Sequence, residues 1–281
     1  MTPRATGSGT LYVVATPIGN LADLSARARS VLSEADVIAA EDTRRARGLL
    51  SHIGANVPVI ANHDHNEEEC LPGLLARLAR GESVALVSDA GTPLISDPGL
   101  TLVRAARAQG VAVVSVPGPS AVLAALSSSG LPTDRFAFEG FLPRRAGARS
   151  ERLRAVANDS RTLVFFEAVH RMPETLQALV ETFGADRQAV LARELTKVHE
   201  QVVAGTLGEL AQRLGADVPL LGEFVIVVAG NLVAGTPDEQ RAQRIFDLLQ
   251  AELPPSRAVA LTAQISGLPR NDVYRLTRVR D

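Results

Sequence analysis

The amino-acid sequence predicts an α/β protein made of two sheet-containing units and a helical tail. Up to residue 129, short apolar runs alternate with segments whose apolar residues recur at helical spacing, a pattern typical of a parallel sheet covered by helices. Beyond that point the apolar runs lie closer together, which favours a mixed or antiparallel sheet in an α+β unit. The last stretch has helical spacing alone. We therefore expect three parts, at residues 1–129, 130–234 and 235–281.

The first unit is expected to contain four strands and three helices. Its apolar runs are 11–15, 37–40, 83–87 and 111–116, and its helical segments are 25–34, 67–80 and 98–109. The second unit has five apolar runs and one long helical segment. They are 136–141, 162–166, 189–192, 200–204 and 224–229, with the helix at 174–183.

Composition limits the classes of function and location. The net charge is −2, so any attraction for nucleic acid must come from local basic patches. With a single cysteine, Cys70, no intramolecular disulfide can form, which indicates a reducing compartment. No apolar run approaches the roughly 20 residues that a membrane helix needs. We expect a cytoplasmic protein without membrane contact.

Three loops rich in glycine and proline follow expected strands, at 16–20, 88–99 and 117–120. The carboxyl ends of parallel strands meet at one edge of a sheet, where open α/β sheets bind ligands, so we expect these loops to form a pocket. Neither G-x-G-x-x-G nor G-x-x-x-x-G-K-[ST] occurs, which removes the usual support for a dinucleotide or nucleoside triphosphate site. Asp97 before Pro98 is typical of a helix N-cap and first turn.

The tail favours either a helix-turn-helix or a small bundle used only for packing. Ala263 is a small residue where two helices would touch, Gly267 suits a left-handed turn, and Val273 is an apolar anchor in the second helix. Spacing alone leaves both interpretations open. In the first, phosphates would meet the arginines on or near the second helix, which are Arg270, Arg275, Arg278 and Arg280.

Eight motifs, spread in order over roughly residues 10–232, resemble those of the ribosomal RNA methyltransferases in the tetrapyrrole methylase superfamily. They are T-P-I-G-N-L-A-D-L, A-A-E-D-T-R, S-D-A-G-T-P-L-I-S-D-P-G, V-P-G-P-S-A, F-E-G-F-L-P, F-F-E-A-V-H-R, A-R-E-L-T-K-V-H-E and G-E-F-V-I-V-V. The tail resembles the helix-turn-helix appended in that family. Tetrapyrrole-modifying relatives carry Gly-Gly-Asp-Pro where this chain has A-G-T-P at 90–93, which favours the RNA branch.

The resemblance implies an enzyme that uses S-adenosylmethionine to methylate the 2′-hydroxyl of a cytidine in the decoding region of 16S ribosomal RNA, within the small ribosomal subunit. It also implies a cofactor cleft between two α/β domains, and a homodimer. Carried over by motif position, the cofactor contacts are Pro17, Asp89, Ala90, Gly91, Thr92, Ile95, Ser96, Ser120, Ala121, Phe166, Leu195 and Phe224.

A ribose hydroxyl is a poor nucleophile, so a group that takes its proton is expected. Lys197 is the first candidate, because a partly desolvated lysine can act as a base and arginine cannot, and it is the only lysine in the sequence. The alternative for Lys197 is a structural ion pair with Glu194 or Glu200. Further candidates for the base are Asp89, Glu41, Asp42 and Glu139.

Basic residues beside the expected cleft predict RNA contacts. They are Arg44, Arg45, Arg144, Arg145, His170 and Arg171, of which the last two instead begin a helix in an alternative interpretation. The histidines and acids between His63 and Cys70 match no common zinc spacing, so we expect no metal site.

Two other functions remain open at this point. One is a methyltransferase that acts on a tetrapyrrole and needs no RNA. The other is a ligand-responsive protein in which the α/β units sense a metabolite and the tail binds DNA without turnover.

Overall fold

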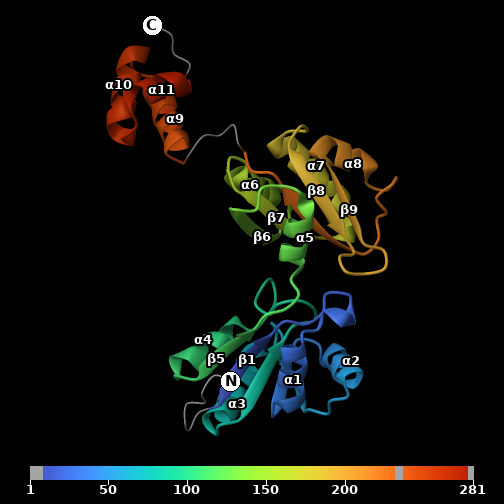
Figure 1. Cartoon of the computed structure of the whole chain (residues 1–281). Helices are drawn as coiled ribbons and strands as arrows, with labels where there is room; N and C mark the ends of the chain where they lie inside the picture. The colour runs from blue at the N-terminus through green and yellow to red at the C-terminus, as the bar shows by residue number, and fades with distance from the viewer. Residues whose placement is uncertain (1–8, 232–236, 278–281) are drawn as a thin grey trace.

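The computed structural model describes residues 9–231 and 237–277. Within these ranges the chain forms two five-stranded sheets, each covered by helices, and a helical bundle at the carboxyl end (Figure 1). The two sheets lie one above the other in Figure 1, and the bundle lies apart from them at the upper left.

The first sheet is parallel throughout, as the alternating pattern predicts, with strand order β3-β2-β4-β1-β5. Strand β3 was not predicted, because it has three residues and only half-buried side chains. The strands are β1 (Thr10–Val14), β2 (Val37–Ala40), β3 (Val59–Ala61), β4 (Ser83–Val87) and β5 (Ala112–Val116).

Helices cover both faces of the first sheet. Leu32 and Leu50 pack on one face, and Leu78 and Leu102 pack on the other. Helix α2 was not predicted, because arginines fill three of the first five positions of its sequence and only Ala46 and Leu50 are buried. The helices are α1 (Ala26–Glu34), α2 (Thr43–Ile53), α3 (Glu67–Ala79) and α4 (Leu100–Ala108).

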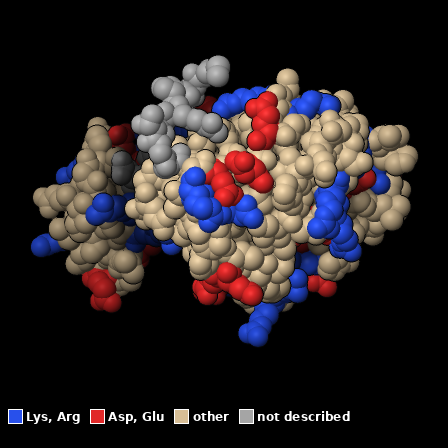
Figure 2. Space-filling view, turned by 90° about the horizontal axis from the view of Figure 1, so that it is seen from below, with Lys and Arg blue, Asp and Glu red and all other residues tan. Residues whose placement is uncertain are grey.

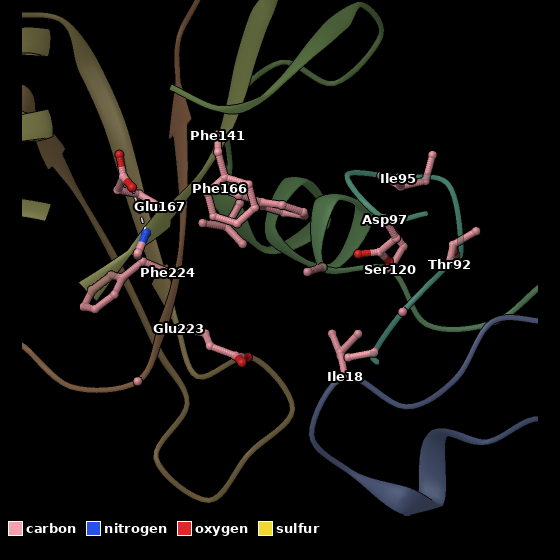
Figure 3. Close-up of a pocket in the computed structure, with 16 residues that line it drawn as sticks. Ile18, Thr92, Ile95, Asp97, Ser120, Phe141, Phe166, Glu167, Glu223 and Phe224 are labelled. Atoms are coloured by element: carbon pink, nitrogen blue, oxygen red, sulfur yellow. Dashed lines mark hydrogen bonds between the residues drawn. The ribbon is translucent and has the colours of Figure 1, made fainter. Parts of the chain in front are cut away.

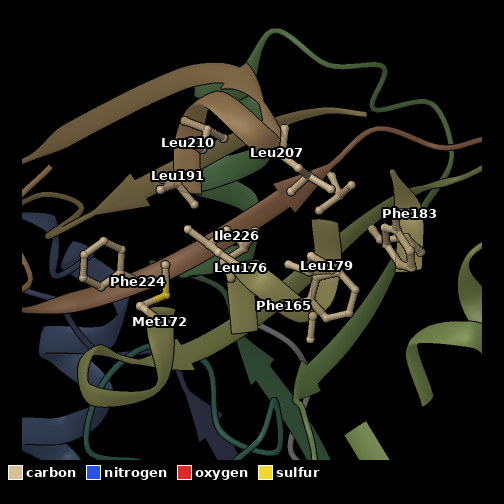
Figure 4. Close-up of a cluster of buried hydrophobic side chains, with 14 of the residues drawn as sticks. Phe165, Met172, Leu176, Leu179, Phe183, Leu191, Leu207, Leu210, Phe224 and Ile226 are labelled. Atoms are coloured by element: carbon tan, nitrogen blue, oxygen red, sulfur yellow. The ribbon is translucent and has the colours of Figure 1, made fainter. Parts of the chain in front are cut away.

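The second sheet is mixed, with strand order β6-β7-β10-β8-β9. Strands β6 and β7 run parallel, and the remaining neighbours are antiparallel. Leu and Phe side chains from the sheet and from α7 and α8 form a large core (Figure 4). The elements are β6 (Phe136–Phe141), α6 (Ala146–Val156), β7 (Thr162–Ala168), η2 (Val169–Arg171), α7 (Met172–Phe183), β8 (Gln188–Arg193), β9 (Gln201–Thr206), α8 (Leu207–Arg213) and β10 (Glu223–Val228).

Helix α5 (Ala121–Ser129) packs against the second sheet, although we expected residues up to 129 in the first unit. Its buried face contains Val122, Ala125 and Leu126, which share a core with Val190 and Val225. The strand-then-helix pattern gave no sign of this, because α5 follows β5 just as the earlier helices follow their strands. The chain therefore crosses from one sheet to the other in the loop at 117–120.

The tail consists of α9 (Pro237–Leu249), α10 (Pro255–Ser266) and α11 (Arg270–Thr277) around a small core of its own. Gly267 is left-handed, with φ of 78°, and Val273 is fully buried, as the helix-turn-helix pattern predicts. Arg278 and Arg280 lie outside the described residues. No helix in the described ranges is long and apolar enough to cross a membrane.

Candidate active site

The loops after β1, β4 and β5 meet at the carboxyl edge of the first sheet, as predicted. The backbones of Thr16 and Gly91 exchange two hydrogen bonds, of 2.9 and 3.0 Å. The hydroxyl of Thr92 donates to the carbonyl oxygen of Pro119 at 3.2 Å. The three loops are therefore joined to one another as well as to their strands.

Backbone strain occurs in two loops of the described ranges, at 88–99 and after β8, where Glu194 and Thr196 have φ of 51° and 68°. Leu94 and Ser96 have φ of 74° and 66°, a left-handed conformation that costs a non-glycine residue about 1–2 kcal/mol. Such residues persist only where the surroundings hold them, and they cluster at functional sites. Gly99 is left-handed as well, and an added Cβ would lie 2.6 Å from a methyl group of Leu86, so any other residue would be strained and would force Leu86 to shift.

A cavity of about 350 Å³ lies between these loops and the second sheet (Figure 3). Its size lies within the range of small-molecule sites. The first sheet's loops and the start of α5 supply Ile18, Ala90, Gly91, Thr92, Ile95, Asp97, Ser120 and Ala121. The second sheet and its loops supply Phe141, Phe166, Glu167, Ala168, Gly222, Glu223, Phe224 and Val225.

Asp97 lines this cavity and is half-buried. Desolvation raises the pKa of Asp97 from its usual 3.8 to about 6, opposed by the Ser88 hydroxyl and reinforced by Glu41, Asp89 and Asp64. The prediction of an N-cap at Asp97 is wrong. Helix α4 begins at Leu100 and its N-cap is Gly99, so the carboxylate of Asp97 is not used by a helix end.

Comparisons with known proteins identify the family to which this chain belongs. Residues 10–211 match the model of the tetrapyrrole (corrin/porphyrin) methylases, and residues 236–277 match that of the RsmI C-terminal HTH domain. The chain is 53% identical to the ribosomal RNA small subunit methyltransferase I of Xylella fastidiosa (strain Temecula1), over 95% of this chain and 98% of that protein. The chain belongs to the tetrapyrrole methylase family.

Further relatives agree with this assignment. The ribosomal RNA small subunit methyltransferase I of Pseudomonas aeruginosa is 51% identical, over 95% of this chain and 96% of that protein. Among solved structures, cobalt precorrin-4 methyltransferase is similar with a TM-score of 0.58 at 18% identity, over 82% of this chain and 98% of that chain. The uroporphyrin-III C-methyltransferase of Thermus thermophilus has a TM-score of 0.53 at 24% identity, over 80% of this chain and 96% of that chain. These two establish the fold.

This tetrapyrrole methylase is a methyltransferase dependent on S-adenosylmethionine. The cavity fits that cofactor, which carries a positive sulfonium and a flat adenine ring. Asp97 and Glu223 offer carboxylates, and the residues that line the cavity include no lysine or arginine. Phe166 and Phe224 offer apolar surface. Backbone groups at 90–92 and the hydroxyl of Ser120 complete the set of residues that would hold the cofactor.

The structure brings together most of the residues that the motifs assigned to the cofactor. Those that line the cavity are Ala90, Gly91, Thr92, Ile95, Ser120, Ala121, Phe166 and Phe224. Pro17, Asp89, Ser96 and Leu195 are not among the lining residues, and Leu195 is buried in the core beneath α5. The lining residues that sequence reasoning missed are Ile18, Asp97, Phe141, Glu167, Ala168, Gly222, Glu223 and Val225. Their motifs were recognised, but which member of each faces the cavity depends on backbone turns.

Lys197 follows β8 and is not among the residues that line the cavity, although it pairs with the lining residue Glu223. Its Nζ donates to Glu194 Oε1 at 2.8 Å and to Glu223 Oε2 at 3.0 Å. Burial opposes the charged form, but the two carboxylates outweigh burial and raise the pKa of Lys197 above its ordinary value. A lysine held in this way keeps its proton, which is the reverse of what a base requires. The structure thus contains the ion pair with Glu194, and a second one with Glu223 in place of Glu200.

Glu41 and Asp89, two of the four further candidates for the base, lie just after β2 and β4 and, like Asp42 and Glu139, are outside the cavity lining. Glu41 accepts a hydrogen bond from the backbone N–H of Asp89 at 3.2 Å, and Asp89 pairs with Arg45 at 3.5 Å. Burial, reinforced by the charges of Asp89 and Asp64, raises the pKa of Glu41.

Within the described ranges, no group of three or more histidines, cysteines and acids is placed to hold a metal.

The basic residues predicted to contact RNA separate into two kinds. Arg44, Arg45, Arg144, Arg145 and His170 are exposed; Arg44 pairs with Asp42 at 2.7 Å and Arg45 with Asp89 at 3.5 Å. Charges of both signs are scattered over the face in Figure 2, which agrees with the net charge of −2. Arg171 does not fit the prediction, because its side chain is 13% exposed and is committed to partners inside the protein.

Gly19 packs against Lys197 and thereby joins the loops of the two sheets. A Cβ at Gly19 would lie 2.4 Å from Lys197 Cγ, in the middle of the side chain. We expect Gly19→Ala to displace Lys197 and Ile18 beside the cavity. Overpacking of this kind costs about 1–3 kcal/mol, so calorimetry should show S-adenosylmethionine binding weakened by roughly tenfold. Gly48→Ala is the control, since a Cβ there meets nothing within 4 Å. Equal affinity in both variants would contradict the proposed contact.

Proposed function

We propose that this enzyme methylates the 2′-hydroxyl of a cytidine in the decoding region of 16S ribosomal RNA. The observation that carries the proposal is the match at about half identity, over nearly the whole chain, to proteins named ribosomal RNA small subunit methyltransferase I. The matching tail domain supports the same branch of the family. We further propose that the substrate is the assembled small subunit and that the enzyme works in the cytoplasm.

The charge of the cavity argues against the alternative of a tetrapyrrole substrate. Natural tetrapyrrole intermediates carry several carboxylates, and like charges at close range disfavour binding. The cavity presents Asp97 and Glu223 and has no lysine or arginine among its lining residues. A ribose with a neutral base avoids this repulsion, provided that its phosphates stay outside, near exposed arginines.

A homodimer is part of the proposal. Large apolar side chains are exposed along the outer edge of the second sheet and in the adjoining loops. Val198 is 96% exposed and Leu221 is 66% exposed, and Val202 lies on the edge strand β9. An unpaired edge strand with exposed apolar neighbours favours contact with another chain.

When bound, S-adenosylmethionine supplies a methyl group on a positively charged sulfur. The protein must then exclude water, orient the ribose and accept the proton of its 2′-hydroxyl. We assign proton acceptance to a carboxylate oxygen of Asp97, because this side chain lines the cavity and has a pKa of about 6. A base with a pKa close to the working pH is the most effective. Lys197 instead holds Glu194 and Glu223 in place.

The proposed reaction predicts where a labelled methyl group goes. Small ribosomal subunits that lack their modifications should accept label from S-adenosylmethionine at one cytidine. Because a 2′-O-methyl group blocks attack on the neighbouring phosphodiester, the labelled position should resist alkaline cleavage. Nuclease mapping locates it. Free 16S RNA, tested in parallel, should accept less label than the particle. Transfer to a porphyrinoid and none to subunits or RNA would overturn the proposal.

Asp97→Asn should lower kcat by about 10²- to 10⁴-fold, in addition to the loss of cofactor affinity that follows from removing one of the two carboxylates that attract the sulfonium. In the wild type, kcat should rise tenfold per pH unit below about pH 6 and level off above it, because the base must be ionised. The folded-state pKa is raised, so ionisation destabilises the fold as the pH rises from about 4 to 6. The variant should therefore melt about 2–4 °C higher than the wild type at pH 8 and equally at pH 4.

Asp186→Asn, on the exposed surface away from the cavity, is the control for Asp97→Asn. It should leave the pH profile and kcat unchanged. An unaltered pH profile in Asp97→Asn would remove Asp97 from the role of base.

Two substitutions at Lys197 test whether this residue acts as the base or forms structural ion pairs. Lys197→Arg can keep both ion pairs but cannot lose its proton, so we expect kcat within about threefold of the wild type. Lys197→Met abolishes the ion pairs and should weaken cofactor binding. Steady-state kinetics and calorimetry on both variants decide the matter. Loss of turnover in Lys197→Arg with cofactor affinity intact would restore Lys197 as the base.

A further inference from the structure

Phe141 borders the cavity and is 54% exposed, although it is the last residue of a strand. Its ring meets Phe166 edge to face, with 5.6 Å between centroids. Phe166 in turn meets Phe138 at 4.9 Å. One face of an aromatic cluster is thus open at the cavity, as Figure 3 shows for Phe141 and Phe166.

A bulge in β6 creates this exposure. Side chains alternate along a strand, so Phe138 and Phe141 would normally lie on opposite faces. The register shifts between Phe138 and Gly140, and Gly140 is left-handed with φ of 65°. The extra residue turns Phe141 onto the same face as Phe138, directly beside Phe166 on the neighbouring strand. Bulges of this kind are used to redirect a side chain beside an active site.

Hydrogen bonds from Arg171 hold the backbone that follows Phe141. The guanidinium donates to the carbonyl oxygens of Leu142 at 2.7 Å and Pro143 at 3.2 Å. It also pairs with the buried carboxylate of Glu167 at 3.4 Å. Glu167 accepts hydrogen bonds from the Thr175 hydroxyl at 2.6 Å and from the backbone N–H of Ala168 at 2.8 Å. These contacts hold the backbone that follows Phe141 in place independently of any ligand.

Arg144 and Arg145 follow three and four residues after Phe141 and are exposed. Among the described residues neither forms an ion pair, whereas Arg152 of the adjoining helix pairs with Glu139. An open aromatic face followed by free arginines is the combination that proteins use for unpaired nucleotides, with the base on the ring and phosphates at the cations.

We propose that Phe141 stacks on the base of the nucleotide that receives the methyl group, while Arg144 and Arg145 contact the adjoining phosphates. This inference rests on the proposed function. A ribose within a helical stem is shielded, and extruding the nucleotide unstacks its base. The ring of Phe141 replaces that lost stacking. Phe166, which also lines the cavity and is less exposed than Phe141, remains available for the cofactor.

The chain contains no tryptophan, so Phe141→Trp introduces a single fluorescent reporter at the proposed contact. An RNA oligonucleotide with the decoding-region sequence should quench its emission, because a stacked base quenches indole. Phe136→Trp, at the other end of the same strand and 39% exposed, is the matched control and should not be quenched. Equal emission from both variants with and without RNA would contradict stacking.

Kinetics provide the second readout. Stacking of one base predicts that Phe141→Ala raises the KM for small subunits by about 5- to 150-fold. The affinity for S-adenosylmethionine should stay within twofold, and Phe141→Trp should retain near wild-type KM. Phe136→Ala should leave both constants unchanged. If Phe141→Ala weakens cofactor binding instead, the ring serves adenine and the inference is wrong.

Two further outcomes separate this inference from the proposed function. If the wild type transfers no methyl group to subunits or RNA, the proposed function fails, whatever Phe141 does. If the wild type transfers it normally and Phe141→Ala has an unchanged KM, only the stacking role fails. Phe141→Leu preserves apolar packing against Phe166 without a flat ring. It should behave like Phe141→Ala, which shows that lost stacking rather than misfolding raises KM.

Discussion

The pair of backbone hydrogen bonds between Thr16 and Gly91 is the interaction on which the site depends. It joins the loops of two neighbouring parallel strands, β1 and β4, and makes their backbones one wall of the cavity. Gly91 is left-handed, and an added Cβ would approach Ile18 to 3.3 Å, so this contact needs glycine. A wall made of backbone keeps its shape without relying on side-chain rotamers, which suits a site that must present fixed amides and carbonyls.

The second half of the chain closes the site through packing. Ile18, from the loop after β1, packs against the core that α5 shares with the second sheet. Gly19, the next residue, packs against the Lys197 side chain, which is tied to Glu194 and Glu223. The contacts between the two halves thus lie at the edge of the cavity. Changes at these residues alter the site even where they do not touch a ligand.

Much of the fold could be predicted from the sequence, because the spacing of apolar residues indicates which face of each helix or strand is buried. The parallel sheet, the mixed sheet and the turn at Gly267 follow from such local signals. The sheet on which α5 packs could not be predicted. The spacing of apolar residues shows which face of a helix is buried, but not which element covers that face. The meeting of three loops was predictable from strand polarity. The surroundings of Asp97 and Arg171 were not predictable, because the helix N-cap at Gly99 instead of Asp97 and the inward turn of Arg171 depend on tertiary contacts.

A net charge near zero conceals a division of charge that fits the chemistry. Carboxylates of Asp97 and Glu223 line the cavity, where a cationic sulfonium is favoured and a polycarboxylate is not. Exposed arginines lie outside the cavity lining, at Arg44 and at 144–145, where we propose that phosphates bind. Arg171 belongs to neither set, because its guanidinium pairs with Glu167 and donates to the carbonyl oxygen of Leu142, next to Phe141. Composition gives only the sum of these charges. The bulge at Gly140 and the loops at the carboxyl edge determine where the positively and negatively charged side chains lie around the cavity.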